Sequence, residues 1–564
     1  MSSATSTHRL SAADFEAVAS GYGTPEALAG IRDAQTSRRM LLLRAALEAQ
    51  PELRQPLTLL TAACARDRRA HAEVFAAPML GAWLHAAIRN PSGAELAYGY
   101  CVAVSAAVRA ALSFQVTIPT DTGTVAIPGL GAAVELGTGE VRVELSGSTL
   151  SFDGPAGSVK VDPPYSRPVS GWWPTRSAGP PADLLIEDLD PYRGCFGLPQ
   201  TGRLAADDRT EFQRNLSAAW RYIRRHHPEH ADAMTGSLRA VVPVRSPDPG
   251  HSVSAASRLA YGAVAVSLSP DPFTVALALI HEFQHMKLGG VLDLMELDRS
   301  DGTARHHAPW REDPRPAGAL FQGAYAHVGV TDFWRVRRRT ADDATARAAT
   351  AEFAYWLVQT RRAVQTLIGS GELTGRGESF LARLAATLDR WRREPVPADV
   401  WAATDEAVEH SAVRWRLRSY VTEPAEIETL ADRWATGSPC PAVRDPGIRT
   451  GLPAGPARPS GLAELVLARS RGQSHPRPAA ADAAYADGDV PAARSAYLHR
   501  MAAGEDADAW AGLALCLRHT GEAGADALSL RPDLVRDVAR RTGGTPVGVA
   551  AWLNVTATVD RCRS

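Results

Sequence analysis

The feature that most constrains this chain is a strongly apolar run over residues 273–288, which carries the pentapeptide HEFQH at 281–285. The run SPDP at 269–272 precedes it and supplies the proline and capping signals of a helix start. The pair Gly289-Gly290 follows it and predicts the helix end. A helix that is apolar on most faces is buried. Because residues 258–268 have the pattern of a strand, the sequence predicts a strand, a tight turn and a buried helix.

Two histidines of this predicted helix are placed to bind one metal ion. His281 and His285 are four residues apart, so they share a helical face, and Glu282 lies beside them. An HExxH pattern on a helix is typical of metal sites in which the glutamate acts on a metal-bound water. The alternative is a pair of buried core histidines. The motif predicts a metal, but it does not distinguish which metal or which reaction.

Two reactions fit a metal on this helix. In a zinc peptidase, Glu282 is the general base, and Glu296, Glu312 or a later histidine is the third ligand. The extended HExxHxxGxxH motif is absent, which excludes a metzincin. In a non-haem Fe(II) oxygenase, three protein ligands leave room for a chelating 2-oxo acid and for dioxygen. Such an enzyme also needs a cation that holds the distal carboxylate of the 2-oxo acid.

The segment that follows supplies cations and a further histidine. Residues 306–316 (HHAPWREDPRP) form a proline-rich loop with Arg311 and Arg315, and guanidinium groups suit two-point binding of a carboxylate. The alternative is a salt bridge between Arg311 and Asp313 in an ordinary turn. A predicted helix then places His327 among small and apolar residues, as a third metal ligand or as a core histidine.

Three runs together resemble a known family. They are IHEFQHMKLGGVLDL at 280–294, HHAPWREDPRP at 306–316 and ALFQGAYAHVGVTDFWR at 319–335. This chain resembles the HExxH-type 2-oxoglutarate-dependent peptide β-hydroxylases, which are encoded beside ribosomally made, post-translationally modified peptides and often accompany radical SAM enzymes. The resemblance is dense over residues 258–335 and leaves out the last hundred residues.

The resemblance implies an enzyme that uses Fe(II), 2-oxoglutarate and O2 to hydroxylate a β-carbon of a ribosomally made precursor peptide. It places iron on His281 and His285. Some members have histidine where this chain has Gln322 and an aromatic residue where it has His327, so the third ligand is open. His327 is preferred, with Gln322 and Glu296 behind it. Glu282 then orients a ligand imidazole through a hydrogen bond, or acts as a base.

The same resemblance assigns the cosubstrate and the substrate contacts. Arg315, ahead of Arg311, is expected to bind the distal carboxylate of 2-oxoglutarate, because prolines flank it. Trp310, Gln322 and Tyr325 are expected to line the substrate channel. The expected partner is the precursor peptide, and a radical SAM maturase of the same pathway is a further candidate. A zinc metallopeptidase stays the alternative, with Zn in place of iron.

Patterns along the whole chain predict a mainly helical α+β protein, in which a zincin-like metal-binding helix lies next to a small β layer. A helical appendage that resembles tetratricopeptide repeats is expected at the C-terminus. The second alternative function is a non-catalytic scaffold that binds a partner through this tail. The predicted regions are 1–112 (helical), 113–200 (β-rich), 201–437 (catalytic, metal-binding), 438–461 (linker) and 462–564 (helical, TPR-like).

Composition excludes several other classes. The 564 residues contain 61 Lys+Arg against 62 Asp+Glu, so no overall positive charge attracts nucleic acid or an anionic membrane. The six cysteines are scattered without a CxxC pair, which is typical of reduced thiols. Neither a secretory signal nor an apolar stretch of about 18 residues is present. We therefore expect a soluble, cytoplasmic protein.

Overall fold

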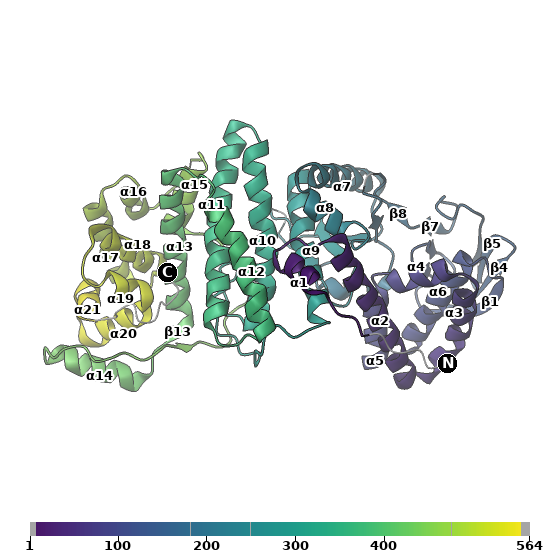
Figure 1. The fold of residues 1–564 in the computed structure, drawn as a ribbon, viewed down its shortest axis with the longest axis horizontal. Helices are drawn as coiled ribbons and strands as arrows, with labels where there is room; N and C mark the ends of the chain where they lie inside the picture. Colours follow the sequence, from purple (N-terminus) through teal and green to yellow (C-terminus); the bar gives the residue numbers. More distant parts are fainter. Residues whose placement is uncertain (1–6, 181, 249, 475–476, 554–564) are drawn as a thin grey trace. The chain divides into compact units, whose positions relative to one another are not determined.

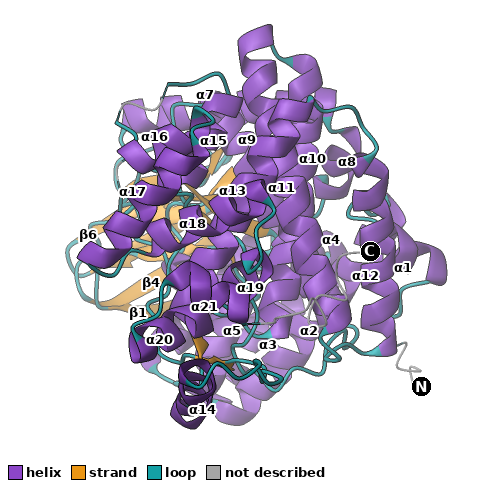
Figure 2. Cartoon of the chain, turned by 90° about the vertical axis from the view of Figure 1, so that its left-hand side faces the viewer, coloured by secondary structure: helices purple, strands orange, loops and turns teal. Residues whose placement is uncertain are grey.

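The computed structural model describes residues 7–553, apart from 181, 249 and 475–476 (Figure 1). The chain divides into two compact units, residues 1–295 and residues 296–564. Helices predominate and several small sheets accompany them, which confirms a mainly helical α+β protein (Figure 2). Within the described residues, no helix combines the length and the apolar character that crossing a membrane requires.

The first unit begins with the helices predicted for residues 10–112. Ser11 caps the first of them, as predicted, because its hydroxyl accepts a hydrogen bond from the Asp14 amide at 3.1 Å. Trp83 and Tyr98 lie in an apolar core to which the helices between residues 25 and 109 contribute. The helices are α1 (Ala12–Ala19), α2 (Pro25–Ala49), α3 (Arg54–Arg66), α4 (Arg68–Ala76), α5 (Leu80–Arg89) and α6 (Gly93–Arg109), with a short 3-10 turn at Pro51–Leu53.

The strands predicted between Phe114 and Val161 are present. Inward-facing Val141, Val143 and Leu145 alternate with outward-facing residues, so one face of the sheet is buried. The antiparallel sheet has the order β1 (Phe114–Thr120), β4 (Gly139–Ser146), β5 (Thr149–Gly154) and β6 (Gly157–Val161). A second sheet joins β2 (Val125–Ile127), β3 (Gly131–Ala133) and β7 (Trp172–Pro174).

A third sheet leads into the HExxH helix. Its central strands β10 (Ala240–Val244) and β12 (Ala263–Ser267) are parallel and buried at every residue, which explains their continuous apolar sequences. The other strands are β8 (Arg176–Ser177), β9 (Leu185–Ile186) and β11 (Ser254–Ala256), in the order β11-β12-β10-β9-β8. The remaining helices of this unit are a 3-10 helix (Pro191–Phe196), α7 (Ala206–His226), α8 (Pro228–Met234) and α9 (Pro272–Leu292).

The predicted end of the HExxH helix is wrong. Helix α9 continues through Gly289 and Gly290 to Leu292, instead of ending at Leu288. The physical reason is close packing against α2. A Cβ atom at Gly290 would lie 2.5 Å from Ile31 Cγ2, so only glycine lets the two helices approach this closely.

The second unit is helical, and its chain breaks agree with the sequence. Helix α11 ends at Gly369 and Pro395 lies between α12 and α13, as predicted. Short strands β13 (Tyr420–Val421) and β14 (Gly447–Ile448) pair with each other. The helices are α10 (Ala317–Thr340), α11 (Asp343–Gly369), α12 (Gly375–Arg392), α13 (Ala398–Ser419), α14 (Pro424–Ala435), α15 (Gly461–Ser470), α16 (Ala480–Ala486), α17 (Val490–Ala503), α18 (Ala507–Thr520), α19 (Ala525–Leu530), α20 (Pro532–Thr542) and α21 (Pro546–Trp552).

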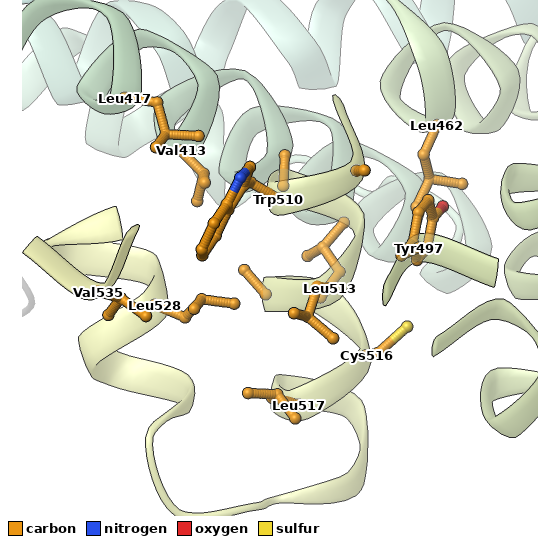
Figure 3. Close-up of a cluster of buried hydrophobic side chains, with 14 of the residues drawn as sticks. Val413, Leu417, Leu462, Tyr497, Trp510, Leu513, Cys516, Leu517, Leu528 and Val535 are labelled. Carbon is orange, nitrogen blue, oxygen red and sulfur yellow. The ribbon is translucent and has the colours of Figure 1, made fainter. Parts of the chain in front are cut away.

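The two compact units do not follow the regions predicted from the sequence. The unit boundary after residue 295 falls inside the predicted catalytic region 201–437, and the predicted linker 438–461 does not separate the 462–564 helices from the preceding ones. Val413 and Leu417 of α13 share a buried cluster with Trp510, Leu528 and Val535 (Figure 3). Because α13 and the C-terminal helices cover each other's apolar side chains, they form one body.

The close packing of α9 against α2 gives a stability prediction. We expect Gly290→Ala to lower the free energy of unfolding by about 1–3 kcal/mol, because its Cβ would also lie 3.2 Å from Tyr261 Cε2. Gly289→Ala is the matched control, since its Cβ would meet nothing closer than 3.6 Å and both variants gain the same helix propensity. Urea unfolding followed by circular dichroism measures both. Equal stabilities would contradict the close approach.

Candidate metal site

Local signals fix the start of the helix that carries the candidate ligands. Strand β12 ends at Ser267, and the Asp271 carboxylate accepts hydrogen bonds from the amides of Phe273 at 3.1 Å and Thr274 at 2.9 Å. Pro272 occupies the first helical position, where its missing N–H costs nothing. The HExxH residues therefore lie near the middle of α9, well inside the helix.

His281, Glu282 and His285 form a compact group of candidate ligands. The two imidazole rings are 4.8 Å apart between centroids and meet edge to face at 78°. One ligand atom from each of the three residues lies within 4.8 Å of the other two. Two donors on one ion, with bonds of about 2 Å, are at most about 4 Å apart. Small side-chain rotations therefore suffice for one divalent ion, and the donor set fits zinc or iron.

Glu282 is held from a second element. Ser254 Oγ of β11 donates a hydrogen bond of 2.7 Å to Glu282 Oε1, and the same oxygen lies 3.8 Å from His281 Nε2. The Glu282 side chain is buried, and this burial raises its pKa against the opposing effects of His285 and Ser254. The carboxylate is thus enclosed and fixed next to both imidazoles, in reach of a group bound between them.

Two other side chains fix the rotation of α9 about its axis. Gln284 Nε2 donates to the Gly21 carbonyl at 2.8 Å, and the buried Lys287 Nζ donates to the carbonyls of Gly21 and Tyr22. At 100° per residue, Lys287 lies on a different face from the histidines. Hydrogen bonds on one face therefore determine where the histidine face points.

His327 belongs to the second unit, where α10 and the preceding loop hold it. Its Nδ1 donates to the Gly323 carbonyl at 2.8 Å, and its ring stacks on Trp310 at 4.0 Å and 13°. Because Nδ1 is used by this bond, Nε2 is the nitrogen suited to coordination. The role of His327 as third ligand stays a prediction.

The two loop arginines share one carboxylate. Arg311 Nε donates to Asp313 Oδ1 at 3.0 Å, and a terminal nitrogen of Arg315 donates to Asp313 Oδ2 at 3.1 Å. Burial opposes ionisation of Asp313, but hydrogen bonds from Arg315 and the Gly455 amide, with the charge of Arg311, hold its pKa below the usual value. The Arg311–Asp313 salt bridge, which was the alternative left open by the sequence, is therefore present. Cosubstrate binding by either arginine stays a prediction.

The other predicted residues also lie in the second unit. Trp310 covers Gly323, where a Cβ atom would lie 2.3 Å from Trp310 Cζ2. Tyr325 is fully buried and its ring lies 5.5 Å from that of Phe380. Gln322 is partly buried on α10. Their role in a substrate channel remains a prediction, as do the ligand roles of exposed Glu296 and of Glu312, which pairs with Arg418.

The first unit contains a second, buried histidine pair that no sequence motif marks. His227 and His230 are both about 1% exposed, and their rings are 6.0 Å apart. Tyr22 and Tyr222 pack against them. The spacing of three residues across a helix start was the available signal, although it is weaker than the four-residue spacing within a helix.

Comparison with known proteins adds no family. No protein-family model matches the chain, and no curated protein is significantly similar to it.

The histidine pair gives a metal-binding prediction. We expect His281→Ala and His285→Ala each to abolish stoichiometric binding of Fe(II), Co(II) or Zn(II), because a site that loses one of two imidazoles keeps too few donors. His251→Ala is the control: this exposed histidine contacts Asp248 and lies outside the group. Metal content after dialysis measures the effect. Full occupancy in both α9 variants would rule the site out.

Proposed function

We propose that the chain is an Fe(II)- and 2-oxoglutarate-dependent oxygenase that hydroxylates a β-carbon in a ribosomally made peptide. The observation that carries the proposal is the group of His281, Glu282 and His285 on a buried helix. A metal enzyme is supported by the position of the buried Glu282 carboxylate beside two partly exposed imidazoles, since a metal held by those imidazoles would give the carboxylate a cationic neighbour. The choice of oxygenase rests on the resemblance of residues 258–335 to the peptide β-hydroxylases.

In this proposal each residue of α9 has a defined task. His281 and His285 hold the metal, and the bound iron with 2-oxoglutarate and dioxygen supplies the oxidation of a C–H bond. Glu282, anchored by Ser254, accepts hydrogen bonds and keeps the neighbouring imidazoles oriented. Arg315 or Arg311 binds the distal carboxylate of 2-oxoglutarate, with Asp313 holding their guanidinium groups in place.

A zinc peptidase is the second candidate, and one distance favours it. Glu282 Oε1 lies 3.8 Å from His281 Nε2, so the carboxylate is close to where a metal-bound water would be. As a general base, Glu282 would take a proton from that water. The Ser254 hydroxyl and the Ala256 amide, both of β11, hold this carboxylate beside His281.

We also propose that helices α16–α18 are a tetratricopeptide-like element. The supporting feature is close helix packing, because Tyr497 of α17 covers Gly512 of α18, where a Cβ atom would lie 2.2 Å from Tyr497 Cζ. Asp489 and Asp506 cap α17 and α18 at the predicted turns. A partner-binding role for this element would not exclude either reaction.

The product distinguishes the two reactions. With Fe(II), 2-oxoglutarate and oxygen, we expect peptides encoded beside the gene to gain the mass of one oxygen, with 2-oxoglutarate consumed. A peptidase would instead give two fragments without 2-oxoglutarate. Glu282→Gln separates the two reactions further. In a peptidase, the loss of the general base lowers the rate about 10²–10⁴-fold. In an oxygenase, Gln still offers an acceptor to Ser254, so the rate is expected to change less. Mass spectrometry and succinate assays provide the measurements, and fragments alone would overturn the oxygenase.

The arginine loop gives a separate prediction on the cosubstrate. Arg315→Ala is expected to weaken 2-oxoglutarate binding about 10- to 150-fold, the effect of one charge-assisted hydrogen bond, with metal binding unchanged. Arg311→Ala tests the second candidate. Arg299→Ala is the control, since Arg299 is an exposed arginine of the same unit. Titration of 2-oxoglutarate at saturating iron measures the affinities. Parental affinity in both loop variants would place the carboxylate contact elsewhere.

A further inference from the structure

The second unit contains a cleft of about 620 Å³ that the proposed reaction does not use. Its walls come from the C-terminal half of α11, from α13, from the loops 305–309 and 443–446, and from residues 530–531. All of these segments lie within residues 296–564, so one compact unit forms the whole cleft. This volume is typical of sites for small organic ligands, which occupy about 300–1,000 Å³.

The lining of this cleft is rich in guanidinium groups. The cationic side chains on its surface are those of Arg305, Arg362, Arg416, Arg444 and Arg531, whereas its carboxylates are those of Glu409 and Asp445. Two of the five arginines have carboxylate partners just outside the lining, since Arg305 pairs with Asp301 and Glu372 and Arg531 pairs with Asp533. The excess of positive charge therefore lies at Arg362, Arg416 and Arg444. A concave surface with more cations than anions attracts anions.

Two of these arginines share a single carboxylate. Arg362 approaches Glu409 Oε2 at 3.5 Å, and Arg416 approaches Glu409 Oε1 at 3.8 Å. Burial opposes ionisation of Glu409, but the charges of Arg416 and Arg362 outweigh it and lower its pKa. One ionised carboxylate therefore balances one of the two guanidinium charges, and the two groups together carry more N–H donors than this carboxylate can accept.

A second pair, Arg444 and Arg531, lines the same cleft as Arg362 and Arg416. A terminal nitrogen of Arg416 donates to the Ser529 carbonyl at 2.8 Å, and one of Arg531 donates to the Arg444 carbonyl at 2.6 Å. Asp533, which is outside the cleft lining, anchors the Arg531 guanidinium. The exposed Arg444 side chain adds a cation at the surface of the cleft. Because Arg531 already donates to Asp533, Thr422 and the Arg444 carbonyl, Arg444 is the cation of this second pair that is open to an acidic group.

An aromatic wall completes the cleft. The His307 ring stacks on Trp415 at 4.5 Å and 25°, and Tyr420 meets Trp415 edge to face at 5.7 Å. Burial and the charges of Arg416 and Arg362 lower the pKa of His307 to about 3, so the ring is neutral at pH 7. This neutral wall offers contact to the carbon skeleton of a ligand and adds no charge.

We propose that this cleft binds a small organic anion with at least two acidic groups, either carboxylates or phosphates. The pair Arg362 and Arg416 receives one acidic group, and Arg444 with Arg531 receives the other. Planar guanidinium groups bind both chemistries through paired N–H donors. None of the lining residues is among those assigned to the metal or to 2-oxoglutarate, so this proposal does not rest on the proposed reaction.

Titration calorimetry of the full chain tests the proposal with two probes, tricarballylate for carboxylates and inorganic pyrophosphate for phosphates. We expect saturable one-to-one binding of at least one probe, and an affinity that falls as NaCl is raised. The preferred probe identifies the acidic group. Arg362→Gln and Arg444→Gln should each weaken this binding by about tenfold or more.

Arg518→Gln is the matched control, since Arg518 lies 3.8 Å from Glu409 but outside the cleft lining. The affinity of this variant for the preferred probe should equal that of the parent. Arg444 is exposed, so its variant remains informative even if replacement of Arg362 disturbs folding; circular dichroism checks both. Absence of saturable binding to either probe would overturn the proposal. Parental affinity in Arg444→Gln and Arg362→Gln, or binding of an oligonucleotide without either small anion, would also overturn it.

Discussion

The close contact between α9 and α2 is the constraint on which the candidate metal site depends. Gly290 allows Ile31 of α2 to approach a position where any side chain would collide, so the C-terminal end of α9 is fixed in the core of the first unit. The Asp271 cap fixes the other end, and Lys287 fixes the rotation through the carbonyls of Gly21 and Tyr22. A helix held at both ends and in rotation presents His281 and His285 in one defined direction.

Local signals in the sequence predicted what local physics determines. The capping run before α9, the Ser11 cap and the alternation in β4 each depend on neighbours within a few residues, and each is present in the structure. The prediction that Gly289-Gly290 ends the helix is wrong because a glycine that terminates a helix adopts a left-handed conformation. Gly290 instead stays helical and packs against α2. Similarly, the composition of residues 438–461 indicates an irregular backbone but cannot show that α13 shares its core with later helices.

In the candidate site, too, contacts within one helix could be predicted, whereas contacts between distant segments could not. The four-residue spacing of His281 and His285 was sufficient to predict neighbouring imidazoles, because a helix makes that spacing a contact. The Ser254 hydroxyl that fixes Glu282 could not be predicted, since it comes from β11, 28 residues earlier in the chain. The buried pair of His227 and His230 was also not predicted. His227 precedes α8 and His230 lies in its first turn, so the regular spacing of one helical face does not relate them.

Arginine chemistry connects the second unit's two proposed anion sites. The chain has only two lysines, Lys160 and Lys287, so almost every cationic side chain is a planar guanidinium group with several N–H donors. Carboxylates of the second unit are shared: Asp313 by Arg311 and Arg315, Glu409 by Arg362 and Arg416, and Glu394 by Arg335, Arg338 and Arg339. Sharing holds each guanidinium in place while leaving it more donors than its partner can accept. Where such a cluster lines a cleft, those donors are the reason that an incoming acid binds there without displacing the carboxylate already present.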